Sequence, residues 1–168
     1  MSTPSNPLVV NTSPLLALAA CNQIELLRSL YVRVVVPEEV DKELSVGTKR
    51  SILPAGLTAA HRVWIEVVPV TYAPKASLLA ELDSGEAEVI TLALELNAST
   101  VLIDERTGRR VAKREGLIPV GSVGIILLAK KKGLIAEVKT QFHEMRNRGI
   151  YLSQRVIDAA IIQAGETP

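Results

Sequence analysis

The stretch LVVNTSPLLAL, residues 8–18, begins as a short apolar run and continues with the residue pattern of a helix. Three polar residues, Asn11, Thr12 and Ser13, separate the two parts. One interpretation is structural: Thr12 or Ser13 caps the helix and Pro14 occupies its first position. The other is functional, because many α/β enzymes begin their active sites with a metal-ligand side chain at the end of a strand. Both interpretations predict a buried strand followed directly by a helix.

This alternation of strand and helix continues along the whole chain. Apolar runs predict strands at residues 8–11, 33–37, 64–70, 99–105 and 117–122, and Pro69 suggests that the third is an edge strand. Helical patterns cover residues 14–30 with a break near Asn22, 37–46, 78–82, 85–97, 106–116, 123–133, 137–149 and 153–165. Residues 45–63 are expected to form a loop with one short helix. We therefore predict an α/β fold with a mostly parallel central sheet of four to five strands and helices on both faces.

Composition limits what kind of protein this is. A length of 168 residues is typical of one domain, so residues 1–168 are expected to form a single one. Cys21 is the only cysteine, which excludes an internal disulfide and a thiolate metal cluster and leaves a core position. No apolar run is long enough to span a membrane and no secretory signal is visible, so we expect a cytoplasmic protein. The net charge of +1 means that nucleic-acid binding would need a local basic patch.

Acidic residues follow several of the predicted strands, where parallel sheets collect their ligands. Together with Asn11, which ends the first strand, they form three groups of candidate site residues. These groups are Glu38, Glu39, Asp41 and Glu43, then Asp83, Glu86 and Glu88, and finally Asp104 and Glu105. Converging carboxylates need a cation, and oxygen ligands without His or Cys favour Mg²⁺ or Mn²⁺. A hard metal points to phosphate chemistry. Residues 83–86 also fit a capping box, and residues 37–43 also fit a solvated helix face.

A basic segment follows the acidic pair at 104–105. It carries Arg106, Arg109, Arg110, Lys113 and Arg114 without an acid among them. Basic groups beside an acidic site suit a metal-dependent nuclease, which must hold the phosphates of its substrate. The alternative is an ordinary surface helix whose cations face water. A phosphate- or nucleotide-binding domain of receiver or flavodoxin type is less favoured, because no Gly-rich phosphate loop occurs.

Several segments, in order, resemble one known family. They are VVNTSPLLAL, VVVPEEVDKEL, GEAEVITLALEL, VLIDERTGRRVAKREGL, GLIPVGSVGIILLAKKKGLI and YLSQRVIDAAIIQAGE. Together, over roughly residues 7–166, they resemble the PIN domain, in particular the small prokaryotic branch related to VapC toxins. The resemblance implies a Rossmann-like fold and a metal-dependent endoribonuclease that hydrolyses single-stranded RNA, typically as the toxin of a toxin–antitoxin pair. It also implies a cognate antitoxin protein and a homodimer or higher oligomer.

The resemblance also assigns roles to individual residues. It implies Glu43, Glu86 and Asp104 as catalytic carboxylates that bind Mg²⁺ or Mn²⁺, with Asn11 and Glu105 as further metal ligands. Thr12 and Ser13 would orient a water or a phosphate, and Arg106, Arg109 and Arg110 would position the RNA. Asn11 stands where the family usually has Asp, and it brings an amide oxygen without charge. A second hypothesis is therefore a catalytically weakened PIN-like fold that binds RNA or protein. Separately, residues 45–63 are a candidate for a flap near the site.

Overall fold

The computed structural model describes residues 6–49 and 59–168, and these form strands and helices that alternate as predicted. The strands are β1 (Leu8–Val10), β2 (Val34–Val36), β3 (Ile65–Val67), β4 (Thr100–Leu102) and β5 (Ile118–Val120). The helices are α1 (Thr12–Ala20), α2 (Leu26–Leu30), α3 (Glu38–Lys49), α4 (Ala59–Arg62), α5 (Ala76–Leu79), α6 (Ser84–Glu95), α7 (Arg106–Arg114), α8 (Ser122–Lys131), α9 (Val138–Asn147) and α10 (Gln154–Gln163).

The five described strands make one sheet in the order β3-β2-β1-β4-β5, and every pairing is parallel. The three central strands β1, β2 and β4 are almost entirely buried, as expected for strands covered on both faces. β3 and β5 lie at the edges, with partly exposed side chains, which confirms the edge position predicted for residues 64–70.

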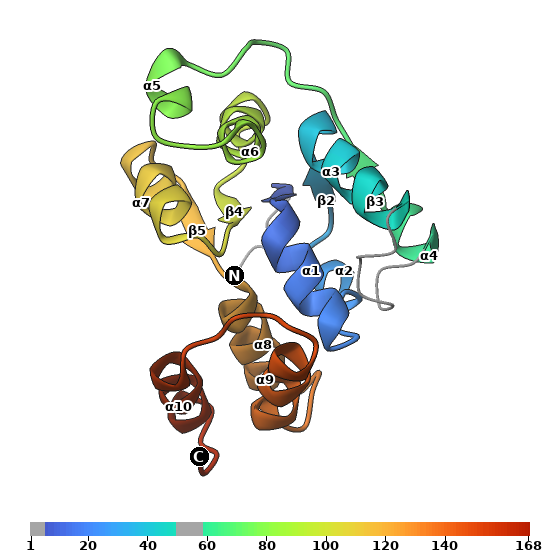
Figure 1. The fold of residues 1–168 in the computed structure, drawn as a ribbon, viewed down its shortest axis with the longest axis vertical. Coiled ribbons are helices and arrows are strands. Elements are labelled where there is room, and N and C mark those ends of the chain that lie inside the picture. Colours follow the sequence, from blue (N-terminus) through green and yellow to red (C-terminus); the bar gives the residue numbers. More distant parts are fainter. Residues whose placement is uncertain (1–5, 50–58) are drawn as a thin grey trace.

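Helices cover both faces of this sheet, which gives three layers (Figure 1). α6 packs on β1 and β4 from one side, with α5 against it. On the other side α1 contacts α8 and α9, α2 contacts α8, and α10 packs against α8 and α9 at the outer part of this layer. The predicted α/β fold with a parallel sheet and helices on both faces is therefore confirmed. No helix within residues 6–49 and 59–168 has both the length and the apolar character needed to cross a bilayer.

Local expectations are confirmed in most places. The helix predicted at residues 14–30 does break, because α1 ends at Ala20 and Asn22 adopts a left-handed backbone with φ of 56°. Val40 and Leu44, four residues apart, form the buried face of α3. Cys21 is buried as predicted, and desolvation raises the pKa of its thiol to about 12.

One boundary prediction was wrong. The helical pattern was predicted to end at residue 46, inside the segment 45–63 expected to form a loop with one short helix, whereas α3 continues to Lys49. Position 47 is a glycine, and an isolated glycine weakens a helix without always ending it. The rest of the predicted flap, residues 50–58, lies outside the residues that the structure describes, and α4 follows it at Ala59–Arg62.

The parallel register brings the carboxyl ends of the central strands to a common edge. Val10 is paired with Leu102, and Leu102 with Val120. One residue further, the backbone amide of Asn11 donates to Leu102 O at 3.0 Å and that of Ile103 donates to Val120 O at 2.9 Å. The segments that carry Asn11, Asp104 and Ser122 therefore start from neighbouring points, and this edge holds the candidate site.

Candidate functional site

Two hydroxyls at the start of α1 bind carboxylates from distant parts of the chain. Thr12 Oγ1 donates to Glu43 Oε2 of α3, and Ser13 Oγ donates to Glu105 Oε1 at 2.5 Å. The helix begins at Thr12, so its N-cap is Asn11, whose side chain makes no capping hydrogen bond. The prediction that Thr12 or Ser13 caps the helix with Pro14 in its first position was therefore wrong. The hydroxyls are engaged by Glu43 and Glu105 instead.

Glu86 lies at the start of α6, and its two carboxylate oxygens differ. The Asp83 side chain accepts a hydrogen bond from Glu86 N at 2.8 Å, and Asp83 N donates to Glu86 Oε2 at 3.4 Å, which completes the capping box seen in the sequence. The other oxygen, Oε1, is buried and has no hydrogen-bond partner in the part of the chain that the structure describes. The residue as a whole is 6% exposed. The capping interpretation of residues 83–86 is confirmed, and it accounts for only one of the two oxygens.

Burial and neighbouring charge both act on Glu86. Desolvation raises the pKa of Glu86, and the carboxylates of Asp83 and Glu105 raise it further, against the lowering effect of the backbone hydrogen bond. A buried carboxylate without a partner is costly to a folded protein. A positive group near Oε1 would therefore stabilise the ionised form of Glu86.

Two glycines allow the acidic residues to approach one another. A methyl group on Gly108 of α7 would lie 2.7 Å from Glu86 Oε1 and 2.8 Å from Ile103 Cγ2, which is too close for any real side chain. A methyl group on Gly85 would lie 3.0 Å from Glu43 Oε1. The starts of α6 and α7 therefore pack closely around Glu86, with Glu43 beside them.

Asp104 occupies the next position along the edge, after β4. Ser122 at the start of α8 donates twice to it, from its backbone amide to Oδ1 at 2.6 Å and from its hydroxyl to Oδ2 at 2.9 Å. Desolvation raises the pKa of Asp104, although the two bonds from Ser122 act in the opposite direction. Arg109 donates to Ile103 O at 3.2 Å and lies close to the Asp104 carboxylate. Ser122 thus holds Asp104 in one orientation.

Asn11 is brought to the same edge and is 5% exposed. It lies between Leu102, to which its backbone is bonded, and the two hydroxyls of Thr12 and Ser13. An amide at this position carries a neutral oxygen and a neutral NH₂ group, and it precedes the two hydroxyls that bind Glu43 and Glu105. The position that the sequence singled out is therefore part of the acidic edge.

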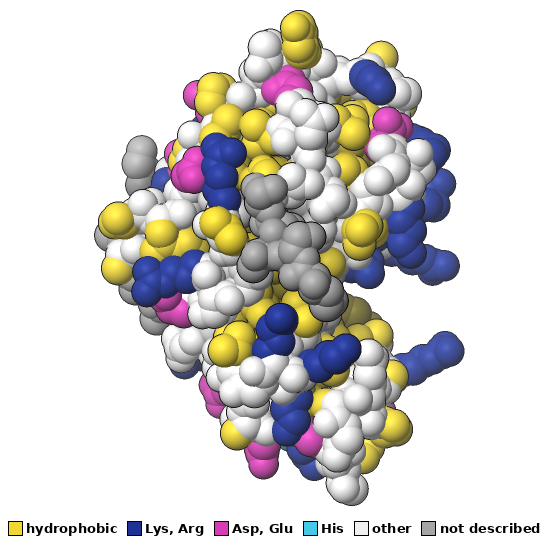
Figure 2. Space-filling model, turned by 180° about the vertical axis from the view of Figure 1, so that it is seen from behind, with side chains coloured by type: hydrophobic (Ala, Val, Ile, Leu, Met, Phe, Trp, Pro, Cys, Tyr) yellow, Lys and Arg dark blue, Asp and Glu magenta, His cyan; other side chains and the backbone are white. Residues whose placement is uncertain are grey.

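The basic residues after Asp104 divide into two groups. Arg110 and Arg114 form ion pairs with Glu81 at 2.9 and 2.7 Å. Arg106 and Lys113 form no ion pair with any residue that the structure describes. A hollow of about 750 Å³ is lined by Asp104, Arg106, Arg109, Arg110 and Lys113 among others. Lys and Arg side chains gather along the edge of the molecule over α7, at the right in Figure 2.

We next asked whether these residues suit a metal ion. The donors are all oxygens, and the buried Glu86 Oε1 lacks a partner, which fits a hard divalent cation. Among the described residues, however, no three His, Cys, Asp or Glu side chains stand close enough together to share one ion. Glu43, Glu105 and Asp104 are each held by a hydroxyl instead. The donor chemistry fits a metal, and the carboxylates would have to turn toward Glu86 to share it.

The fold and this edge define the class of protein: a three-layer α/β protein whose carboxylates and arginines meet at the carboxyl end of a parallel sheet. A family model for the PIN domain matches residues 7–166, so the chain belongs to the PIN-domain family. A PIN domain indicates a nuclease-type function, RNA binding and, in general, the use of divalent metal ions. No curated protein matches the chain in a sequence comparison.

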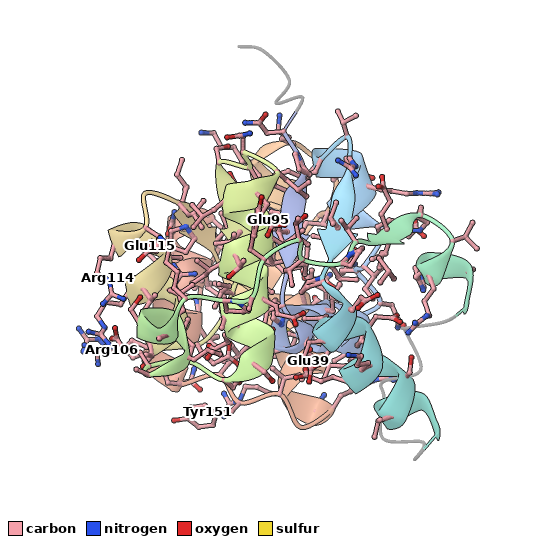
Figure 3. The ribbon with its side chains drawn as sticks, turned by 90° about the horizontal axis from the view of Figure 1, so that it is seen from above. Glu39, Glu95, Arg106, Arg114, Glu115 and Tyr151 are labelled. Carbon is pink, nitrogen blue, oxygen red and sulfur yellow. The ribbon has the colours of Figure 1, made fainter. Side chains whose placement is uncertain are left out.

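The sequence predicted the acidic residues of this edge as site candidates, but not Ser122. The sequence GS at 121–122 directly follows the fifth strand, so the rule that selected Asn11 and Asp104 as strand-end residues applied there too. A serine carries no charge that marks a metal site in sequence, and Ser122 acts by donating two hydrogen bonds to Asp104. Figure 3 shows the common edge from another side: Glu39, Arg106 and Tyr151 lie toward one end of the sheet, and Glu95 toward the other.

Proposed function

We propose that this protein is a metal-dependent endoribonuclease that hydrolyses single-stranded RNA at the acidic edge formed by Asn11, Glu43, Glu86, Asp104 and Glu105. The observation that carries the proposal is the buried Oε1 of Glu86, which has no hydrogen-bond partner among the described residues and feels the carboxylates of Asp83 and Glu105, in a PIN-domain fold. Such an oxygen is explained by a cation that binds there during function.

Each residue of the edge has a proposed role toward the ion. Glu86 and Asp104 would hold Mg²⁺ or Mn²⁺, with Glu43 and Glu105 turning in from Thr12 and Ser13, and the amide oxygen of Asn11 completing the set. When bound, a divalent ion lowers the pKa of water and offsets the charge that develops on a phosphoryl oxygen. Both donors of Ser122 set the direction of the Asp104 carboxylate, whereas Glu43 and Glu105 would exchange their hydrogen bonds from Thr12 and Ser13 for the ion.

The basic side chains would hold the RNA. Arg106 and Arg109 line the hollow beside Asp104, so a phosphate bound by them lies next to the carboxylates. Arg110 is paired with Glu81 and would contribute less net charge, because part of its field is already neutralised. In the hydrolysis itself water attacks phosphorus, a P–O bond breaks, and the leaving oxygen takes up a proton.

The substitution Asp104→Asn tests the proposal. We expect metal-dependent cleavage of single-stranded RNA to fall by at least about a hundredfold, the upper end of what changes next to metal ligands cost. The fold should persist, because Asn keeps an oxygen that can accept from Ser122 N and because the partly buried site already disfavours a charge. Cleavage rates with Mn²⁺, and thermal unfolding in parallel, provide the two measurements.

The matched control is Asp158→Asn on α10, where the carboxylate accepts from the Gln154 side chain at 2.8 Å. This variant should cleave RNA like the parent protein. Excess chelator should abolish cleavage by Asp158→Asn and by the parent protein, and Mn²⁺ should restore it. Equal cleavage by Asp104→Asn, or cleavage that persists in chelator, would show that the proposed site is wrong.

A second function is favoured by one pair of observations. Asn11 lacks the charge of the family's usual Asp, and the carboxylates do not converge on a single point among the described residues. These features suit a catalytically weakened PIN domain that binds RNA or protein. The chelator experiment separates the two: the binding module would hold RNA with or without metal and would cleave it in neither case.

The remaining parts of the proposal concern the biological setting. We propose that the whole chain, 1–168, forms one PIN-like domain of the VapC-related branch and acts as the toxin of a toxin–antitoxin pair. A cognate antitoxin and a homodimer or higher oligomer belong to the same proposal. Coexpression with the product of the neighbouring gene, followed by a growth assay, tests it: the toxin proposal requires growth arrest by this chain alone and relief by its partner.

A further inference from the structure

A second hollow, of about 980 Å³, shares Asp104, Arg106 and Arg109 with the first. One wall holds Arg106 and Arg109, and the opposite wall is the segment Ile150–Ser153 that leads into α10. We call this segment the Tyr151 wall. Figure 2 shows the molecule hollowed at its right edge, between the basic side chains above and the part of the molecule that carries α10 below.

The Tyr151 wall presents an aromatic ring to solvent on an anchored backbone. Tyr151 is 89% exposed, whereas Ile150 and Leu152 on either side pack against the core. Ile150 N donates to Met145 O at 3.0 Å, and Ser153 caps α10 by accepting from Val156 N at 3.3 Å. Figure 3 shows Tyr151 and Arg106 projecting on the same side of the molecule. The ring therefore stands at a defined place without a role in the packed core.

The floor of the hollow is kept open by a glycine. A methyl group on Gly121 would lie 2.9 Å from both Arg109 Nη1 and Asp104 Oδ1. Only glycine leaves room there for the carboxylate and the guanidinium to lie side by side at the base of the hollow. The hollow thus joins an acid, two cations and an exposed aromatic ring.

We infer that the Tyr151 wall stacks a nucleobase of single-stranded RNA, next to the phosphate that Arg106 and Arg109 hold; this inference rests on the proposed function. A single strand offers alternating anionic phosphates and flat unpaired bases, which match the two walls of the hollow. A duplex hides the faces of its bases, so the wall selects against it. Tyr151 is then a positioning residue that sets where the strand lies relative to Asp104.

Binding measured without cleavage tests this inference. The parent for the test is the Asp104→Asn protein in chelator, and the probe is a short fluorescein-labelled oligoadenylate, alone or paired with its complement. Tyr151→Ala should weaken binding of the single strand by roughly fivefold or more, the loss expected for one stacked base. Tyr151→Phe keeps the ring and should bind like the parent, and neither change should alter the weak binding of the duplex.

The chain supplies a matched control in Tyr72, which is 73% exposed. Its backbone amide donates to Glu95 at the far end of α6, away from the hollow. Tyr72→Ala should leave binding unchanged. Tyr151→Ala should also leave the salt dependence of binding unchanged, whereas Arg106→Gln should reduce it, because only the arginine neutralises a phosphate.

The outcomes separate the inference from the nuclease proposal. Equal binding by Tyr151→Ala and the parent overturns the inference, and a loss in Tyr151→Phe as large as in Tyr151→Ala shows that the hydroxyl and not the ring matters. Altered self-association of Tyr151→Ala with unchanged RNA affinity would assign the wall to a protein interface instead. If Tyr151 proves necessary for binding while the intact protein never cleaves RNA, the wall stands and the nuclease proposal fails.

Discussion

Asn11 is the residue at which the sequence and the family disagree, and the structure gives that disagreement a physical meaning. Asn11 is buried, and it lies at the sheet edge that also carries Glu86 and Glu105. The charge of Glu105 helps to raise the pKa of Glu86. A neutral amide limits the repulsion among these groups when no ion is bound. It also removes one charge from the attraction for a divalent ion.

We therefore predict that Asn11→Asp makes the protein less stable without metal and more responsive to it. The added carboxylate should raise Mn²⁺ affinity by about tenfold, equal to about 1.4 kcal/mol. In chelator its melting temperature should fall below that of the parent, because a further charge is buried among like charges. Thermal unfolding with and without Mn²⁺ measures both effects.

The control for this change is Asn97→Asp, an exposed position with a left-handed backbone that Asp also tolerates. It should shift neither the melting temperature in chelator nor the response to Mn²⁺. If Asn11→Asp behaves in the same way as Asn97→Asp, then Asn11 does not face the metal.

At the level of elements, the start of α9 depends on the C-terminal segment. Glu166 accepts from the backbone amides of Val138 at 2.8 Å and Lys139 at 3.1 Å, and Lys130 of α8 lies 3.2 Å from it. Partial burial acts to raise the pKa of Glu166, but these hydrogen bonds outweigh it and the pKa is lowered. One carboxylate thus satisfies the exposed end of α9 and ties it to α8.

We predict that Glu166→Gln lowers the free energy of unfolding by about 1 kcal/mol at pH 7. Because the pKa of Glu166 is lower in the folded than in the unfolded protein, its charge stabilises the fold above the unfolded value of about 4.3. This contribution disappears as the pH falls through the folded pKa. Urea unfolding at neutral and at acidic pH should therefore show a difference between the two proteins that vanishes in acid.

Glu144→Gln on the same helix is the control for this effect. Glu144 makes an exposed i,i+4 pair with Arg148, at 3.9 Å, and such pairs contribute little. The control should unfold like the parent at both pH values. A pH-independent loss of stability in Glu166→Gln would mean that shape and not charge matters at this position.

At the level of the whole molecule, the positive charge available to bind RNA comes from a local group of side chains and not from the net charge. The net charge is +1, so the overall field attracts RNA only weakly. In the proposed site the cations that would bind RNA are those of α7, and of these Arg110 and Arg114 already form ion pairs with Glu81. Arg106 and Lys113 have no such partner among the described residues, so they leave the larger unneutralised charge.

We predict that Arg106→Gln and Lys113→Gln each flatten the salt dependence of RNA binding by up to about 0.7 in the log–log slope, as expected for one phosphate contact on a single strand. Arg114→Gln should flatten it less, because Glu81 already offsets that charge. Anisotropy titrations over a range of salt concentrations provide the slopes. Equal slopes for the three variants would argue against a strand that passes along this face of α7.

The sequence by itself determined the order and type of the elements. Strands buried on both faces need continuous apolar runs, and helices need an apolar stripe with caps and terminal glycines, so both leave local patterns. The acids at the strand ends were equally readable, since the carboxyl ends of parallel strands share one edge. Even the capping box at residues 83–86 was visible from spacing alone.

Only the tertiary structure decided which hydrogen-bond partners these residues have. Thr12 and Ser13 had the chemistry of helix caps, yet their hydroxyls bind Glu43 and Glu105, which lie 31 and 92 residues further along the chain. Ser122 holds Asp104 across 18 residues, and Glu86 keeps one oxygen in its cap and one without a partner. A local pattern records what a side chain can donate or accept, whereas its partner depends on which segments the sheet brings side by side.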